Sequence, residues 1–230
     1  MKTKRFGIVL PSWIYKPERR ALADEAFRTL NGPNTVLFEQ KPELLVVSNG
    51  TWGLDLSGVF GFDWRVVDGH GKAKGTEQSL AWGTAVVLEE TNVDFIVWLG
   101  DDAKFHPEWL NQLSALIDRH PDARSWNVYR SAYETYHRPV AKEGLDVQTT
   151  CLCGHGLTFS RQEWEEWGID WKTGNWPSPA GDTLDLHHSW KRPGERWCTK
   201  LSYIEHTGKV GMHCTGVEPE YAVNFQGTGE

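Results

Sequence analysis

Cysteine is scarce in this chain of 230 residues, which contains four cysteines and no Cys-x-x-Cys pair. So few cysteines at these spacings argue against a disulfide-stabilised scaffold. On a strand, Cys151, Cys153 and His155 would lie on one face. A zinc site that adds Cys198 or Cys214 to these residues is one hypothesis. The simpler expectation is that the cysteines are buried free thiols.

Long apolar runs are also missing. No run is long enough to cross a membrane, and the apolar part of MKTKRFGIVLPSW is too short for a signal peptide. We therefore expect no membrane span and a cytoplasmic location. Internal repeats, low-complexity tracts and clear linkers are absent as well, so we expect a single domain over residues 1–230. The hydrophobic share of 39%, with 13 tryptophans, is enough for a sizeable core.

Positive charge is not in excess, because the net charge is −7. This balance argues against nonspecific binding to nucleic acid or to anionic membranes. One segment, SWKRPGERWCTK, nevertheless places cations among aromatic residues, as nucleic-acid or diphosphate sites do. The alternative is an ordinary solvated face. The residues concerned are Trp190, Lys191, Arg192, Arg196, Trp197 and Lys200.

The most informative stretch is DFIVWLGDDAKFHPEWL. Its apolar run, 95–99, predicts a strand that is buried on both faces, as in the middle of a parallel sheet. The run ends at Gly100 and places Asp101 and Asp102 at the carboxyl end of the strand, where ligands bind in open α/β sheets. Pro107 suits the first turn of a following helix. The alternative is that the two acids only cap the turn and the helix start.

Strand and helix patterns alternate along the first half of the chain. We therefore expect an α/β fold, specifically a three-layer α/β/α sandwich with a mostly parallel, Rossmann-like central sheet. The expected strands cover 6–11, 43–50, 64–71, 95–99, 125–130, 149–160 and 200–206, and the expected helices cover 16–30, 75–90, 108–119, 161–168 and 183–191.

The order of PSW, VVSNG, GKAKG, GDD, GHG, GDT and YIEH along the chain resembles that of motifs in GT-A fold glycosyltransferases, particularly the family-2-like group that uses nucleotide-diphosphate sugars. The resemblance implies a nucleotide-sugar-binding half, 1–110, and an acceptor-binding half, 111–230. It also implies contacts to the nucleoside or diphosphate from Pro11, Trp13, Asn49, Lys72, Lys74, Gly75 and Asp101. A plain turn at Asn49 and two solvated lysines are the alternatives.

The resemblance also implies a divalent cation, Mn²⁺ or Mg²⁺, at a DXD-like motif. Asp102 matches the metal-binding acid, and either His206 or His213 matches a late histidine ligand. The chain departs from the family pattern at Gly100, where many members carry Asp or Asn. This departure leaves fewer oxygen ligands for the cation.

On the acceptor side, the resemblance implies that His155, Gly156 and Trp176 line the acceptor pocket. Asp182 matches the acid that removes the proton of the acceptor hydroxyl in an inverting transfer. The usual preceding Glu is replaced by Gly181. A core role for His155 and an N-cap role for Asp182 are the alternatives.

The resemblance thus implies a metal-dependent, inverting glycosyltransferase that moves a sugar from a nucleotide-diphosphate sugar to an acceptor hydroxyl. Two other hypotheses are a non-catalytic nucleotide-sugar or carbohydrate-binding module and a phage-type transferase acting on hydroxymethylated DNA bases. The donor sugar, the nucleotide and the oligomeric state are left open. So are the acceptor, which could be a glycan, protein, lipid or modified DNA base, and the choice between inversion and retention.

Overall fold

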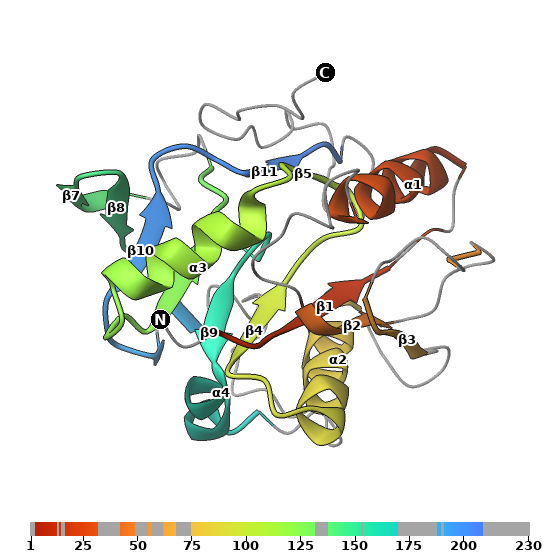
Figure 1. The fold of residues 1–230 in the computed structure, drawn as a ribbon, viewed down its shortest axis with the longest axis horizontal. Coiled ribbons are helices and arrows are strands. Elements are labelled where there is room, and N and C mark those ends of the chain that lie inside the picture. The colour runs from red at the N-terminus through yellow and green to blue at the C-terminus, as the bar shows by residue number, and fades with distance from the viewer. Residues whose placement is uncertain are drawn as a thin grey trace.

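The computed structural model contains, in the residues that it describes, a nine-stranded sheet and a separate two-stranded sheet with four helices of at least seven residues around them (Figure 1). The strand order of the large sheet is β3-β2-β1-β4-β9-β6-β10-β8-β7, and the small sheet pairs β11 with β5. The structure describes residues 3–12, 14, 17–31, 42–48, 55–56, 62–67, 75–131, 138–152, 154–169, 188–189 and 191–208.

The first four strands of the large sheet are parallel. They are β1 (Phe6–Pro11), β2 (Pro42–Ser48), β3 (Trp64–Val67) and β4 (Phe95–Trp98). Parallel neighbours need long crossover connections. α1 (Pro17–Asn31) lies between β1 and β2, and α2 (Thr76–Glu90) lies between β3 and β4. These six predicted elements are confirmed.

The other half of the large sheet is mainly antiparallel. β9 (Thr158–Ser160) pairs antiparallel with β4 and with β6 (Ser125–Asn127), and β10 (Arg196–Thr199) then pairs parallel with β6. β8 (Asp146–Thr149) joins β10 and forms a hairpin with β7 (Pro139–Glu143) at the edge. The sequence did not predict β7 or β10.

Three predicted strands are wrong in extent. Those expected over 125–130 and 200–206 are strands only at Ser125–Asn127 and Ile204–His206. The stretch 149–160 is not continuous, because Thr149 ends β8 and β9 begins only at Thr158. Between them the chain turns at Gly154–Gly156. Cys151 and His155 therefore do not share the face of one strand.

The predicted helices of the second half are found. α3 (Trp109–Arg119) follows β5 (Ala103–Phe105), a strand that was not predicted. α4 (Arg161–Trp167) ends at Gly168 in the left-handed conformation. Of the helix expected over 183–191, the described residues 188–189 and 191 are helical. The late strand is β11 (Ile204–His206).

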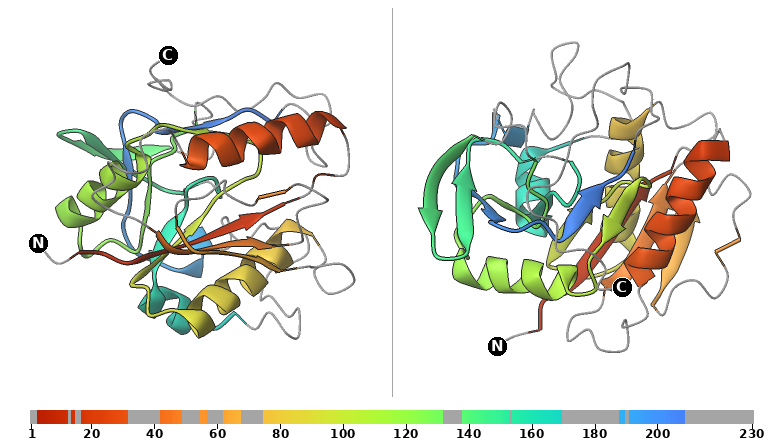
Figure 2. Two further views of the ribbon diagram at one scale, coloured as in Figure 1. Left: turned by 45° about the vertical axis from the view of Figure 1, so that its right-hand side comes forward. Right: turned by 90° about the horizontal axis from the view of Figure 1, so that it is seen from above.

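The helices cover both faces of the large sheet (Figure 2). α1 and α3 lie on one face with the small sheet, and α2 and α4 lie on the other. The core residues follow the two-residue period of strands: Ile8 and Leu10 of β1 pack on the α1 side, whereas Val9 packs on the α2 side. The three-layer α/β/α class is therefore confirmed. No helix in the described part of the chain is long and apolar enough to span a membrane.

Trp98 anchors the α2 side of the core. Its side chain is fully buried, its indole N–H donates to Thr84 Oγ1 of α2 at 2.9 Å, and it packs edge-on against Phe159 and Trp164. A buried tryptophan needs a partner for its N–H as well as apolar contacts. Trp98 therefore fixes the end of β4, from which the acidic pair extends.

Candidate functional site

The acidic pair lies between β4 and β5. Asp101 and Asp102 are 4% and 8% exposed, so two carboxylates are almost fully withdrawn from solvent. The pair does not cap the following helix, since β5 intervenes and Glu108 occupies the N-cap position of α3. Buried carboxylates are retained only where partners compensate their charge. The surrounding groups therefore decide what the site can bind.

His206 reaches this pair through the small sheet. β11 runs antiparallel to β5 and places His206 opposite Ala103, the residue after Asp102. The backbone N–H of Thr207 then donates to the Asp102 carbonyl at 2.8 Å. As a result, His206 Nε2 lies 3.3 Å from Asp102 Oδ2. Of the two late histidines considered, His206 is thus beside the acid, and His213 lies outside the described residues.

His155 comes from the turn before β9. The N–H of Gly156 donates to the Trp98 carbonyl at 2.7 Å, which holds this turn against the end of β4. The His155 ring stacks on the His206 ring, with centroids 4.2 Å apart and planes inclined by 28°. Gly156 has φ of 83°, and a Cβ there would lie 2.5 Å from Asn127 Oδ1. Only glycine suits this turn.

The three side chains form a candidate cation site. One potential ligand atom from each of Asp102, His155 and His206 lies within 4.8 Å of the others. Gly208 leaves space beside two of them, because a Cβ at this position would lie 2.2 Å from Asp102 Oδ2 and 2.8 Å from His206 Nε2. A carboxylate and imidazoles around such a space fit a divalent first-row metal ion.

Arg19 is the residue of this site that sequence reasoning missed. Its buried guanidinium donates to Asp102 Oδ2 at 2.7 Å and also to Asp101 Oδ1. A signal was available: Arg19 precedes Ala23 and Ala26 by one and two helical turns and so falls on the buried face of α1. An arginine on the apolar stripe of a helix indicates a buried acidic partner.

The protonation states suit cation binding. Burial alone would raise the pKa of Asp102, but the His206 hydrogen bond and nearby positive charge, including Arg19, lower this pKa below its ordinary value. Burial, reinforced by the charge of His206, lowers the pKa of His155 to about 3. At neutral pH the site therefore offers an ionised carboxylate and a neutral His155 imidazole, the forms that bind metals.

Two other predicted donor-site residues lie at the same edge of the sheet. Pro11 is the last residue of β1, and the next residue, Ser12, donates its N–H to the Ser48 carbonyl at the end of β2. Gly75 is the N-cap of α2, with φ of 91° and no side-chain cap. The contacts of Pro11 and Gly75 with the nucleoside or the diphosphate stay predictions. Trp13, Asn49, Lys72, Lys74, Trp176 and Asp182 lie outside the described residues.

A buried ion cluster flanks the predicted acceptor segment. Glu163 of α4 is 3% exposed and accepts hydrogen bonds from Arg124 and from Arg192, the latter at 2.8 Å. His188 Nε2 lies 3.2 Å from the same carboxylate. The cluster ties α4 to His188 and Arg192.

The basic-aromatic segment is explained largely by internal contacts. Arg192 pairs with Glu163 and Glu166, and the buried Arg196 donates to the His188 carbonyl at 2.9 Å. Trp197 is 5% exposed. Arg196 and Trp197 are therefore packed inside the protein, whereas Lys191 is exposed and Trp190 lies outside the described residues.

The zinc hypothesis finds no support in the described residues. Cys151 and Cys198 are buried thiols outside any disulfide, as expected, and neither belongs to the cation cluster. Burial raises the pKa of the Cys198 thiol to about 12, so it is protonated at neutral pH. A protonated thiol is a poor metal ligand. Cys153 and Cys214 lie outside the described residues.

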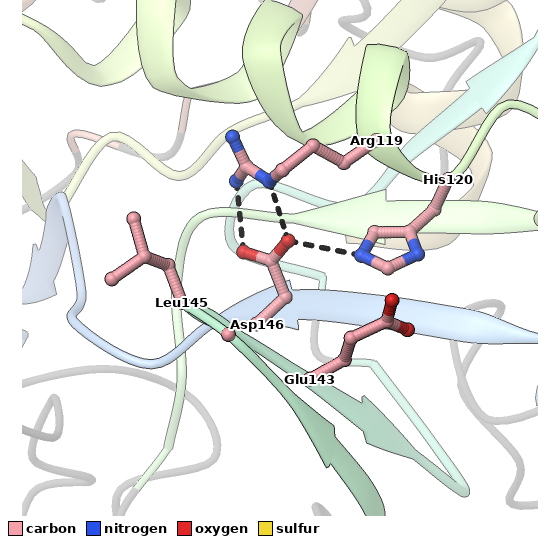
Figure 3. Close-up of a pocket in the computed structure, with 6 residues that line it drawn as sticks. Arg119, His120, Glu143, Leu145 and Asp146 are labelled. Carbon is pink, nitrogen blue, oxygen red and sulfur yellow. Dashed lines mark hydrogen bonds and ion pairs between the residues drawn. The ribbon is translucent and has the colours of Figure 1, made fainter.

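A pocket of about 370 Å³ lies elsewhere, between the C-terminal end of α3 and the β7–β8 hairpin (Figure 3). Asp146 accepts two hydrogen bonds from Arg119, at 2.6 and 2.8 Å, and lies 2.9 Å from His120 Nε2. His120 in turn stacks on Trp197 with centroids 3.7 Å apart. These contacts compensate the charge of Asp146 and attach the hairpin to α3.

No protein-family model and no curated protein matches the sequence. Solved structures do match the fold. S. aureus TarS 1-349 in complex with UDP-GlcNAc has a TM-score of 0.56 and 14% identity, over 93% of this chain and 61% of that chain. A second S. aureus TarS structure has a TM-score of 0.56 and 14% identity, over 89% of this chain and 37% of that chain. A197 from STIV has a TM-score of 0.50 and 11% identity, over 88% of this chain and 84% of that chain.

The chain thus spans less than two thirds of the TarS chains that it matches. At these identities the likeness shows the fold alone, which is a mixed α/β fold shared with TarS.

Proposed function

We propose that this protein is a glycosyltransferase that uses a nucleotide-diphosphate sugar and a divalent cation. The observation that carries the proposal is the meeting of Asp102 and His206 at the carboxyl end of β4, in a fold shared with a protein that was crystallised with UDP-GlcNAc. This edge of an open α/β sheet is where ligands bind. The donor, the cation and the chemistry are proposals for this chain.

In the proposed donor site, Asp102 and His206 hold the cation, which would neutralise charge on the departing diphosphate. Arg19 and Asp101 fix the orientation of Asp102, because Arg19 bridges both carboxylates. Gly75 is the N-cap of α2 and has no side-chain cap, and the N-terminus of a helix favours an anion. Lys72 and Lys74 precede this turn and supply further positive charge.

On the acceptor side, Asp182 is proposed as the general base. It would accept the proton of the acceptor hydroxyl as the oxygen attacks the anomeric carbon, while the bond to the diphosphate breaks and the configuration inverts. His155 and Gly156, which are predicted to line the acceptor pocket, lie beside the proposed donor site.

The first test is calorimetric titration of the full chain with UDP and with GDP, in Mn²⁺ and then in EDTA. Micromolar binding of one nucleotide that needs Mn²⁺ and disappears in Asp102→Asn is the expected result. The matched control is Asp122→Asn, an exposed acid after α3 that should bind like the parent. Absence of nucleotide binding with any metal would overturn the donor site.

A second candidate is a non-catalytic nucleotide-sugar-binding module. It is favoured by one observation: Arg19 already neutralises much of the acidic pair without a metal. Such a module would bind nucleotide equally well in EDTA and would release no nucleoside diphosphate from a donor sugar. Measured release that is lost in Asp182→Asn, with donor binding retained, would exclude it.

A further inference from the structure

We infer that His155 is a third protein ligand of the cation, and that the resulting site of two imidazoles and one carboxylate prefers Mn²⁺, Co²⁺ or Zn²⁺ over Mg²⁺. The inference rests on the proposed function only for the presence of a cation at Asp102 and His206. It adds a ligand from a separate segment of the chain and a choice of metal.

The first argument is the place that His155 occupies. A Cβ at Gly100 would lie 2.6 Å from both Cε1 and Nδ1 of His155 and 2.9 Å from Asp102 Oδ1. The imidazole therefore fills the space that a side chain at position 100 would take, directly beside the Asp102 carboxylate. The imidazole of His155 thus takes the place of the carboxylate or amide that an Asp or Asn at position 100 would supply.

The second argument is an unsatisfied nitrogen. Nδ1 of His155 is buried and has no hydrogen-bond partner among the described residues. Leaving a buried polar atom unpaired costs about 1–3 kcal/mol. Ligation of a cation by this ring would offset that cost. The stacking on His206 and the hydrogen bond from Gly156 to β4 hold the ring in position.

The third argument is charge. Arg19 contacts both Asp101 and Asp102, so the two carboxylates and one guanidinium leave a single net negative charge. Mg²⁺ prefers about six oxygen ligands and keeps several waters, whereas imidazole suits later first-row metals. A site with one available carboxylate and two imidazoles therefore disfavours Mg²⁺.

The test is a titration of the nucleotide-free protein with MnCl₂, CoCl₂ and MgCl₂. We expect Mn²⁺ and Co²⁺ to bind more tightly than Mg²⁺ by at least about tenfold. His155→Gln should weaken the binding of Mn²⁺ and Co²⁺ by at least about tenfold. Even the removal of a group that only orients a metal ligand lowers metal affinity by about this factor. The matched control is His106→Gln, since His106 lies outside the cluster.

Three results would overturn the inference. If Asp102→Asn abolishes binding but His155→Gln binds like the parent, the cation site stands and His155 is not a ligand. If Mg²⁺ binds as tightly as Mn²⁺, the metal preference is wrong. If Asp102→Asn itself binds normally, the cation site of the proposed function fails as well.

A second measurement needs no variant and so does not depend on the folding of His155→Gln. Pulsed electron paramagnetic resonance of the Mn²⁺-loaded protein detects nitrogen bound directly to the ion. Couplings from two imidazoles are expected. A signal from one imidazole would overturn the inference while leaving the proposed pair of Asp102 and His206 intact.

Discussion

Gly100 and His155 are complementary, since the His155 ring lies where a side chain at position 100 would be. A Cβ at Gly100 would come within 2.6 Å of the ring, closer than non-bonded atoms approach. The glycine that looks like a lost ligand in the DXD-like motif therefore makes room for a histidine from a distant segment. This pairing connects residues 55 positions apart, and it leads to the first prediction.

Gly100→Ala should displace the His155 ring. We expect a loss of about 1–3 kcal/mol in the free energy of unfolding, as for overpacked cores, together with weaker Mn²⁺ binding. The measurement is urea unfolding and calorimetry of Gly100→Ala, His155→Ala and the double variant. Because the two sites touch, the double variant should be more stable than the sum of the single losses indicates. Strictly additive losses would contradict the clash.

Arg19 and a cation should compete for Asp102 Oδ2, because the guanidinium donates to this same oxygen at 2.7 Å. Arg19→Met removes the buried countercharge and is expected to cost about 3–5 kcal/mol of stability without metal. Saturating Mn²⁺ should restore more stability to the variant than it adds to the parent protein. Thermal unfolding with and without Mn²⁺ measures both effects.

The control for this experiment is Arg20→Met, the exposed neighbour on α1. It should change stability by no more than about 0.5 kcal/mol and leave the Mn²⁺ response unchanged. An equal Mn²⁺ response in Arg19→Met and in the parent would show that Arg19 and the cation do not share the carboxylate.

Much of the fold could be predicted from local patterns. The apolar runs of β1, β2 and β4 and the periodicity of α1 and α2 are strong signals, because each element is buried by repeating contacts. The short strands β5, β7 and β10 were missed. Each has only three to five residues. β5 and β10 become strands by pairing with segments far away in sequence, and β7 pairs with its neighbour β8 in a hairpin at the edge of the sheet.

The candidate site could be predicted only in part, for the same reason. Asp102 follows a strand whose burial is evident from sequence, so its place at the sheet edge could be inferred. The position of His206 beside Asp102 depends on the pairing of β11 with β5, which the local sequence pattern does not reveal. His155 and Arg19 reach Asp102 from a turn and from a helix face, and only tertiary packing brings them there.

A change in the Asp146 pocket should leave metal binding at the cation site unaffected. Asp146→Asn keeps the shape of the side chain but removes the charge that Arg119 contacts twice. Hydrogen bonds to charged groups contribute about 1.5–3 kcal/mol, so we expect a stability loss of that size. The Mn²⁺ affinity should not change. Calorimetry and urea unfolding test both statements, and an altered Mn²⁺ affinity would show that the hairpin and the cation site are coupled.

Glu163 should make stability depend on pH in the acid range. Burial raises its pKa, but hydrogen bonds from His188, Arg192 and Arg124 outweigh burial and lower the pKa from an ordinary 4.5 to about 2. A carboxylate with a lowered folded-state pKa contributes stability above its unfolded pKa, and this contribution is lost as the pH falls from about 4.5 towards 2. The difference corresponds to about 3 kcal/mol.

The measurement is urea unfolding of the parent and of Glu163→Gln between pH 7 and pH 3. The variant should be less stable at pH 7 by about 3 kcal/mol, and the gap should narrow as the pH falls below 4.5, because the parent then also loses the charge. Glu165→Gln is the matched control, since Glu165 lies on the same helix with its side chain 62% exposed. A gap that stays constant down to pH 3 would show that Glu163 stabilises α4 by packing rather than by its charge.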